Sequence, residues 1–187
     1  ASLYGVVKAA LASSEIDHVY GMVNGIEGML QDHTIDLGES LSEEELELLK
    51  LTPAAYLGSC RYKLPESLTD AFYETIFEKF RRMEIGYFLY IGGNDSMDTV
   101  SKLSRYAAHH GSDIRFIGIP KTIDNDLIQT DHTPGYGSAA KYVAASVREI
   151  ALDASVYQQK AVTIVELMGR HAGWLTAASA LARKFEG

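Results

Sequence analysis

The stretch YFLYIGGNDSMDTVSKLSRYAAHH, residues 87–110, decides the fold that we expect for this chain. The apolar run Tyr87 to Ile91 has the length and composition of a buried strand, and Asp95 to His109 has the pattern of a helix. Gly92 and Gly93 permit a tight turn between the two. A strand, a turn and a helix make up the first half of a β-α-β unit, which continues into a second, parallel strand.

The same alternation of apolar runs and helical patterns extends over the rest of the chain. It predicts further strands at His18 to Met22, Ile114 to Ile119 and Val162 to Leu167, and further helices at Pro65 to Met83, Gly135 to Leu152 and Gly173 to Phe185. This order predicts an α/β fold with a doubly wound, mostly parallel sheet and helices on both faces, Rossmann-like in its three layers. Ligands of such sheets bind beyond the carboxyl ends of the strands.

Composition and charge exclude several classes of protein. The chain has 187 residues, of which 47% are hydrophobic, so it can bury a sizeable core. Its formal net charge is −8, and its basic residues are scattered, so we expect no nucleic-acid partner. The single cysteine, Cys60, excludes an internal disulfide. No apolar run approaches the roughly 18 residues of a membrane span. We expect a cytoplasmic protein without a membrane partner.

Polar clusters follow three of the expected strands. GGNDS occupies residues 92–96, PKTIDND occupies 120–126, and MGR occupies 168–170. Because the carboxyl ends of parallel strands lie at one edge of a sheet, we expect the three clusters to converge on one crevice. The acidic stretch at 41–50 is different, since Ser42 and Glu45 have the spacing of a capping box at the start of a solvated helix.

The GGNDS cluster by itself is open to two interpretations. Asn94, Asp95 or Ser96 can cap the helix that follows, and a carboxylate in the first turn complements the helix dipole. Alternatively, the backbone amides at such a helix start bind a phosphate.

The PKTIDND cluster favours a phosphate site. Turn chemistry explains Asp124, Asn125 and Asp126, but it does not explain why Lys121 and Thr122 accompany them after a strand. Phosphoryl transfer to an alcohol needs a carboxylate that accepts the hydroxyl proton and cations that neutralise the moving phosphoryl group. Asp124 is the candidate for the first role and Lys121 for the second.

The three clusters, read as GGNDS, PKTIDND and MGRHAGW in this order, resemble the phosphofructokinase family and, more narrowly, its pyrophosphate-dependent branch. GSCRY at 58–62 resembles the family's segment of small residues followed by arginine and an aromatic residue. The resemblance implies that residues 1–187 are one phosphofructokinase-like domain, as an internal segment. The family's first strand with its donor loop is expected before Ala1, and the C-terminal half is expected after Gly187.

This resemblance also implies an activity, the Mg²⁺-dependent transfer of a phosphoryl group from pyrophosphate to the 1-hydroxyl of fructose 6-phosphate. The product is fructose 1,6-bisphosphate. Asp124 is then the general base and Lys121 a catalytic cation. The implied donor-binding residues are Gly92, Gly93, Asn94, Asp95, Ser96, Arg61 and Tyr62. The implied substrate-binding residues are Thr122, Asp126, Met168, Gly169 and Arg170. Members of the family also tend to form homo-oligomers.

Two positions point to pyrophosphate rather than ATP. Members that use ATP resemble GGDGS and PGTIDND, with glycine where this chain has Asp95 and Lys121. Asp95 opposes the α-phosphate of a nucleotide by charge and bulk, and Lys121 stabilises the phosphate that leaves pyrophosphate. Asn94 stands where the family has an acidic residue associated with Mg²⁺, so the metal position that it predicts lacks that charge. An ATP-dependent 6-phosphofructokinase and a non-catalytic regulatory subunit that binds sugar phosphates are the alternatives.

Overall fold

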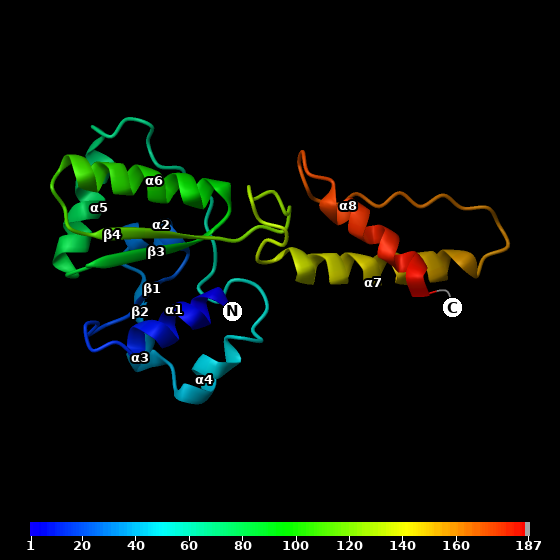
Figure 1. Cartoon of the computed structure of the whole chain (residues 1–187), viewed down its shortest axis with the longest axis horizontal. Helices are drawn as coiled ribbons and strands as arrows, with labels where there is room; N and C mark the ends of the chain where they lie inside the picture. Colours follow the sequence, from blue (N-terminus) through cyan, green and yellow to red (C-terminus); the bar gives the residue numbers. More distant parts are fainter. Residues whose placement is uncertain (186–187) are drawn as a thin grey trace. The chain divides into compact units, whose positions relative to one another are not determined.

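The computed structural model of the chain describes residues 1–185 (Figure 1). Contacts between its segments divide the chain into two compact units. Unit 1 consists of Ala1–Ile91 and Asp95–Ile119, and unit 2 consists of Gly92–Asn94 and Pro120–Gly187. None of the helices in the described residues is long and apolar enough to cross a membrane.

The β-α-β unit that the sequence predicts is present. Strand β3 (Tyr87–Gly92) is followed by helix α6 (Asn94–His109) and strand β4 (Arg115–Pro120), and β4 pairs with β3. The pairing is parallel: the amide of Arg115 donates to the carbonyl of Gly86 at 3.0 Å, and that of Lys121 donates to the carbonyl of Gly92 at 2.8 Å. The α/β fold class is therefore confirmed.

Helix α5 (Ala71–Arg82) supplies much of the core of unit 1. Asp70 caps it by accepting a hydrogen bond from the amide of Phe72 at 2.9 Å. Apolar side chains at helical spacing on one face are buried, and Phe80 among them is fully buried. The Phe80 ring lies 5.2 Å from the ring of Phe88 on β3 and 5.9 Å from that of Phe116 on β4, measured between centroids. The aromatic core thus fixes α5 to the parallel strands.

The N-terminal part of unit 1 differs from the expected pattern. The strand expected at His18 to Met22 is shorter, β1 (Tyr20–Met22), and it pairs with β2 (Thr34–Asp36) in an antiparallel sheet of its own. The expectation of a parallel strand in the main sheet was wrong here. A three-residue strand such as β2 is too short to show a period of two, so no pattern in the sequence predicts this partner. Helix α2 (Gly25–Leu30) connects the two strands.

Three further helices complete unit 1: α1 (Ser2–Leu11), α3 (Leu37–Ser40) and α4 (Glu43–Leu48). The predicted capping box of α4 is confirmed, because the Ser42 hydroxyl accepts from the amide of Glu45 and the Glu45 carboxylate accepts from the amide of Ser42.

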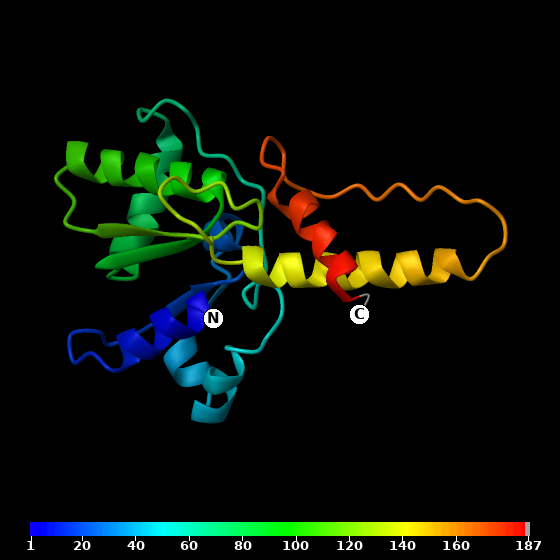
Figure 2. The same ribbon diagram turned by 45° about the vertical axis from the view of Figure 1, so that its right-hand side comes forward.

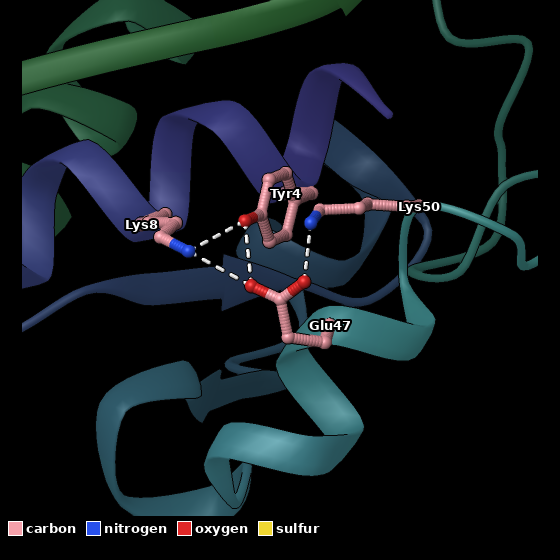
Figure 3. A network of polar contacts seen from close by, with 4 residues as sticks. All are labelled: Tyr4, Lys8, Glu47 and Lys50. Carbon is pink, nitrogen blue, oxygen red and sulfur yellow. Dashed lines mark hydrogen bonds and ion pairs between the residues drawn. The ribbon is translucent and has the colours of Figure 1, made fainter.

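A polar network fastens α4 to α1 (Figure 3). The Tyr4 hydroxyl and the Lys8 ammonium group donate to Oε1 of Glu47 at 2.7 and 2.8 Å. Lys50 forms an ion pair with the same carboxylate, and its ammonium nitrogen lies 4.5 Å from the centroid of the Tyr4 ring. The Glu47 carboxylate on α4 therefore binds two side chains of α1 and Lys50, which follows α4.

Unit 2 is built around helix α7 (Tyr136–Ser155), against which α8 (Trp174–Ser179) and the 3₁₀-helix η1 (Ala180–Phe185) pack. The helices expected at Gly135 to Leu152 and Gly173 to Phe185 are thus confirmed, although the second divides into two elements.

The strand expected at Val162 to Leu167 is not formed. This stretch is an extended segment without regular structure, and it runs back beside α7 (Figures 1 and 2). Val162 is 91% exposed and Ile164 is 90% exposed. A strand needs a neighbouring backbone for its hydrogen bonds, and no segment of the described chain pairs with this one.

We expect Phe80→Ala to lower the free energy of unfolding by about 3–5 kcal/mol, because it leaves a cavity among rings that cannot close around it. Urea denaturation followed by circular dichroism measures this change. Tyr142→Ala is the matched control, since Tyr142 is 74% exposed and its loss should change stability by no more than about 0.5 kcal/mol. A loss below about 1 kcal/mol for Phe80→Ala would contradict the assignment of the core.

We expect the junction of α1 and α4 to weaken in acid. Hydrogen bonds from Lys50, Lys8 and Tyr4 lower the pKa of Glu47 from 4.5 to about 2. Because the folded pKa lies below the unfolded one, the stabilisation is complete above pH 4.5 and is lost as the pH falls towards 2. Amide exchange of α1 and α4, measured by NMR between these values, tests this. Glu47→Gln should remove the acid dependence of exchange in α1, and Glu44→Gln on α4 should leave it unchanged.

Candidate active site

The GGNDS cluster forms the turn from β3 into α6. Gly92 and Gly93 both have ordinary negative φ angles, so this turn does not require the conformational freedom of glycine. Instead, Gly93 leaves space, because a Cβ atom added to it would have the Lys121 carbonyl oxygen, 3.8 Å away, as its only close neighbour among the described residues.

The side chains that follow this turn do not cap the helix. Asn94 and Asp95 are exposed, Ser96 is half-buried, and none of the three makes a side-chain hydrogen bond or ion pair with the described residues. The capping interpretation is therefore not supported. Asp95 and Ser96 belong to unit 1, whereas Gly92–Asn94 belongs to unit 2.

The PKTIDND cluster of unit 2 starts beside the same turn, because the amide of Lys121 donates to the carbonyl of Gly92 at 2.8 Å. Thr122 then forms a parallel bridge with Gly135, and its amide donates to the carbonyl of Pro134 at 3.1 Å. Its hydroxyl accepts from the amide of Asp124 at 3.1 Å. Thr122 thus holds the loop in place, whatever further contact its hydroxyl makes with a substrate.

Asn125 is the internal anchor of this loop, a role that the sequence did not reveal. It is 8% exposed and has the left-handed backbone conformation, with φ 57°. Its Oδ1 accepts from the amide of Thr133 at 2.8 Å, and its Nδ2 donates to the carbonyl of Asp131 at 3.1 Å. Asparagine tolerates this conformation better than most residues, and that preference was the available signal. Its neighbours are less buried: Asp124 is half-buried and Asp126 is exposed.

The charged side chains of the loop remain available to a ligand. Within residues 1–185, the carboxylates of Asp124 and Asp126 and the ammonium group of Lys121 have no hydrogen bond or ion pair. The stem of Lys121 lies against Gly135, where an added Cβ would be 3.4 Å from its Cε. Gly135 has φ 104°, a conformation that favours glycine, so it permits both the turn into α7 and this close approach.

The MGR cluster forms a tight turn before α8. Met168 is 70% exposed. Gly169 has φ 155°, and an added Cβ would lie 2.2 Å from the carbonyl oxygen of Ala172, so another residue does not fit. Arg170 is exposed and has no partner in the part of the chain that the structure describes.

The structure brings two of the three clusters into direct contact. The third follows a residue that packs against the same apolar cluster as one of them. GGNDS and PKTIDND meet at the hydrogen bond between Gly92 and Lys121. Ile123 of PKTIDND and Leu167, directly before MGR, pack against the same apolar cluster of α7 and α8. Arg61 and Tyr62 belong to unit 1, where Arg61 is exposed and the Tyr62 ring stacks on that of Phe72 at 5.5 Å.

The carboxylates of the predicted clusters, including Asp95 beside the metal position predicted at Asn94, do not form a close group of three metal-ligating side chains in the described residues. Among the described residues, the group of three metal-ligating side chains that lie close together is His18, Asp36 and Glu39, outside the predicted clusters. Local structure accounts for this group, because Asp36 caps α3 and its Oδ2 lies 2.6 Å from Nδ1 of His18. That hydrogen bond raises the pKa of His18.

Comparisons with known proteins agree with the geometry. The family model described as phosphofructokinase matches residues 1–186. A pyrophosphate–fructose 6-phosphate 1-phosphotransferase of Halomonas elongata is 46% identical over 191 residues, covering 100% of this chain and 45% of that protein. An enzyme of the same name from Xanthomonas campestris pv. campestris is 50% identical over 162 residues, 85% of this chain and 38% of that protein.

A solved structure shows the same fold. The crystal structure of a pyrophosphate-dependent phosphofructokinase from Nitrosospira multiformis matches with a TM-score of 0.87 at 44% identity, over 97% of this chain and 45% of that one. The chain thus spans less than half of the length of these relatives. Because the family model matches almost every residue, this chain belongs to the phosphofructokinase family.

Proposed function

We propose that the protein to which this chain belongs transfers a phosphoryl group from pyrophosphate to the 1-hydroxyl of fructose 6-phosphate. The observation that carries the proposal is the PKTIDND loop, whose backbone is fixed while the side chains of Lys121, Asp124 and Asp126 have no partner among the described residues. The names of relatives that are 46% and 50% identical support the same reaction. The family match spans both units, which supports treating residues 1–187 as part of one phosphofructokinase-like domain.

The chemistry follows from the roles of two side chains. Asp124 accepts the proton of the 1-hydroxyl as its oxygen attacks the terminal phosphorus of pyrophosphate. The bond from that phosphorus to the bridging oxygen breaks, and the bridging oxygen leaves with the other phosphate. Lys121 stabilises the negative charge that develops on this leaving group. A fixed backbone reduces the reorganisation needed to reach this arrangement, which is the contribution that Asn125 makes.

The remaining candidate residues bind the sugar phosphate and pyrophosphate. Arg170, with Met168 and Gly169, binds the phosphate of the sugar, because a guanidinium group forms paired hydrogen bonds with phosphate oxygens. Thr122 and Asp126 lie beside the 1-hydroxyl. Arg61 and the amides of the GGNDS turn bind pyrophosphate.

Pyrophosphate is favoured over ATP by Asp95 and Lys121. The Asp95 carboxylate is exposed and has no partner among the described residues, so its charge is directed at whatever ligand approaches the start of α6. A nucleotide would place its α-phosphate there, and repulsion would oppose it. Pyrophosphate is shorter and does not need that position.

Mg²⁺ is the metal that we propose for the reaction. Mg²⁺ binds oxygen ligands and is commonly held by one or two carboxylates together with substrate phosphates. The residues present fit this pattern, since Asp124 and Asp126 offer carboxylates without partners in the described chain and Asn94 offers an exposed amide oxygen. When bound, the ion neutralises charge on the phosphates. Oxygen atoms of pyrophosphate would have to complete its coordination.

A cytoplasmic location and a homo-oligomeric state complete the proposal. The single cysteine fits a reducing compartment, and the family resemblance supports assembly from identical subunits.

We expect Asp124→Asn in the full-length protein to lower kcat by roughly 10²- to 10⁴-fold, because the amide cannot accept the proton of the sugar hydroxyl. A coupled assay with fructose 6-phosphate, pyrophosphate and Mg²⁺ measures this loss. Asp131→Asn makes the same chemical change in the same loop at an exposed side chain without an assigned role, and it should retain nearly full activity. A loss of less than tenfold for Asp124→Asn would rule out this carboxylate as the general base.

We expect the double variant Asp95→Gly/Lys121→Gly to lose activity with pyrophosphate and to gain some activity with ATP. Initial rates with each donor at saturating fructose 6-phosphate test this. Asp95→Asn alone keeps most of the bulk of the side chain and removes its charge. It therefore distinguishes charge repulsion of the nucleotide from steric exclusion. Unchanged use of both donors by the double variant would show that these two positions do not select the donor.

A further inference from the structure

We propose that Asn24 and Lys102 hold the segment 57–66 from its two ends and thereby position Arg61 for the donor. The inference rests on the proposed function, because it takes Arg61 to be a ligand of pyrophosphate. Asn24 and Lys102 are then positioning residues, which do not touch the donor themselves. All of the residues concerned lie in unit 1.

The segment needs such support because it has little structure of its own. Residues 51–70 contain no helix or strand. Within the described chain, residues 59–66 make no backbone-to-backbone hydrogen bond at all. Backbone groups that lie against a protein surface without regular structure take side chains or water as partners. The side chains that reach this segment therefore determine how rigidly its backbone is held.

Asn24 holds the upstream end. It lies at the N-cap position of α2 with a left-handed backbone, φ 63°, yet its side chain does not cap that helix. Its backbone amide donates to the carbonyl of Leu57 at 2.7 Å, and its Nδ2 donates to the carbonyl of Ser59 at 3.1 Å. A Cβ atom added to Gly58 would lie 2.5 Å from the same Nδ2. The two loops thus fit closely, and the asparagine amide points at the segment instead of at its own helix.

Lys102 holds the downstream end. It lies on α6, its side chain is only 7% exposed, and its ammonium group donates to the carbonyl of Leu64 at 3.4 Å and to Oε1 of Glu66 at 2.8 Å. Asp98, one turn earlier on α6, pairs with the same nitrogen at 2.8 Å. Hydrogen bonds to Asp98 and Glu66 raise the pKa of Lys102, so the group stays charged. The lysine therefore ties the segment to the helix that carries Asp95.

Core contacts reinforce the downstream attachment. Leu64 is 3% exposed, and the Tyr73 hydroxyl donates to the carbonyl of Pro65 at 2.6 Å. Tyr62 also packs against this core, with its ring 5.5 Å from that of Phe72, but among the described residues Arg61 itself makes no such contact.

Arg61 lies between the two attachments and remains exposed, with no partner for its guanidinium group among the described residues. An arginine on a fixed backbone loses less conformational freedom on binding an anion than one on a mobile loop. Weakening either attachment should therefore weaken binding of the donor more than binding of the sugar. A purely structural role predicts something else, namely lower thermal stability with an unchanged KM for pyrophosphate in the protein that remains folded.

The test uses the full-length protein and compares KM for pyrophosphate, KM for fructose 6-phosphate and kcat. We expect Lys102→Met and Asn24→Gly each to raise KM for pyrophosphate by about five- to tenfold, within the range of couplings between contacting residues. KM for fructose 6-phosphate should change less than about twofold. Glycine is chosen at Asn24 because it keeps the left-handed backbone while it removes the amide.

Lys79→Met is the matched control. Lys79 has a side chain that is 13% exposed and an ion pair with Asp32 at 2.7 Å, and it does not contact the segment 57–66. Its loss should lower stability comparably and leave KM for pyrophosphate unchanged. If Lys102→Met does not fold, Asn24→Gly decides the question alone.

A double-mutant cycle with Arg61→Ala separates the donor role of Arg61 from the positioning role of Lys102. We expect Arg61→Ala to raise KM for pyrophosphate and Lys102→Met to add less than about twofold in that background. If Arg61→Ala leaves KM for pyrophosphate unchanged, the donor role of Arg61 is wrong and the inference fails with it. Two outcomes would overturn the positioning role and leave the proposed reaction intact. In the first, Arg61→Ala raises KM for pyrophosphate but Lys102→Met and Asn24→Gly do not. In the second, Lys102→Met and Asn24→Gly raise the KM values for pyrophosphate and fructose 6-phosphate alike.

Discussion

The parallel pairing of β3 with β4 is the constraint on which the candidate site depends. Its last hydrogen bond joins the carbonyl of Gly92 to the amide of Lys121 at 2.8 Å, at the point where both strands end. Parallel strands bring their carboxyl ends to one edge, so two motifs that are separated by nearly 30 residues in the sequence leave the sheet side by side. The aromatic core under the strands keeps that edge in place.

Apart from Thr122, the side chains that hold the loops differ from those that are available for chemistry. Asn125 and Thr133 are buried, and their side chains form hydrogen bonds with backbone groups of the PKTIDND loop and of the residues that follow it. In unit 1, Lys102 does the same for the segment that contains Arg61. Arg61, Lys121, Asp124 and Asp126 have no side-chain partner among the described residues, so a ligand that reaches them does not need to break an existing ion pair. This division is typical of sites whose backbone is already fixed before the ligand binds.

The sequence-based prediction is wrong where a strand depends on pairing with a segment that is distant in the sequence. The apolar run from Val162 to Leu167 suits a strand, but no neighbouring backbone in the described chain pairs with it. The opposite error occurred at β2, where three residues form a strand that no local pattern announces. The capping box of α4 was predicted correctly because both of its partners lie within four residues.

The sequence by itself determined the β-α-β order, the longer helices, the capping box of α4 and the three polar clusters, because each depends on neighbours a few residues apart. Only the tertiary structure decided which strands pair, that Asn94, Asp95 and Ser96 do not cap α6, and that Asn125 rather than its charged neighbours anchors the loop. Those features depend on hydrogen bonds and burial between segments whose approach is set by the packed core. A local pattern contains no information about that approach.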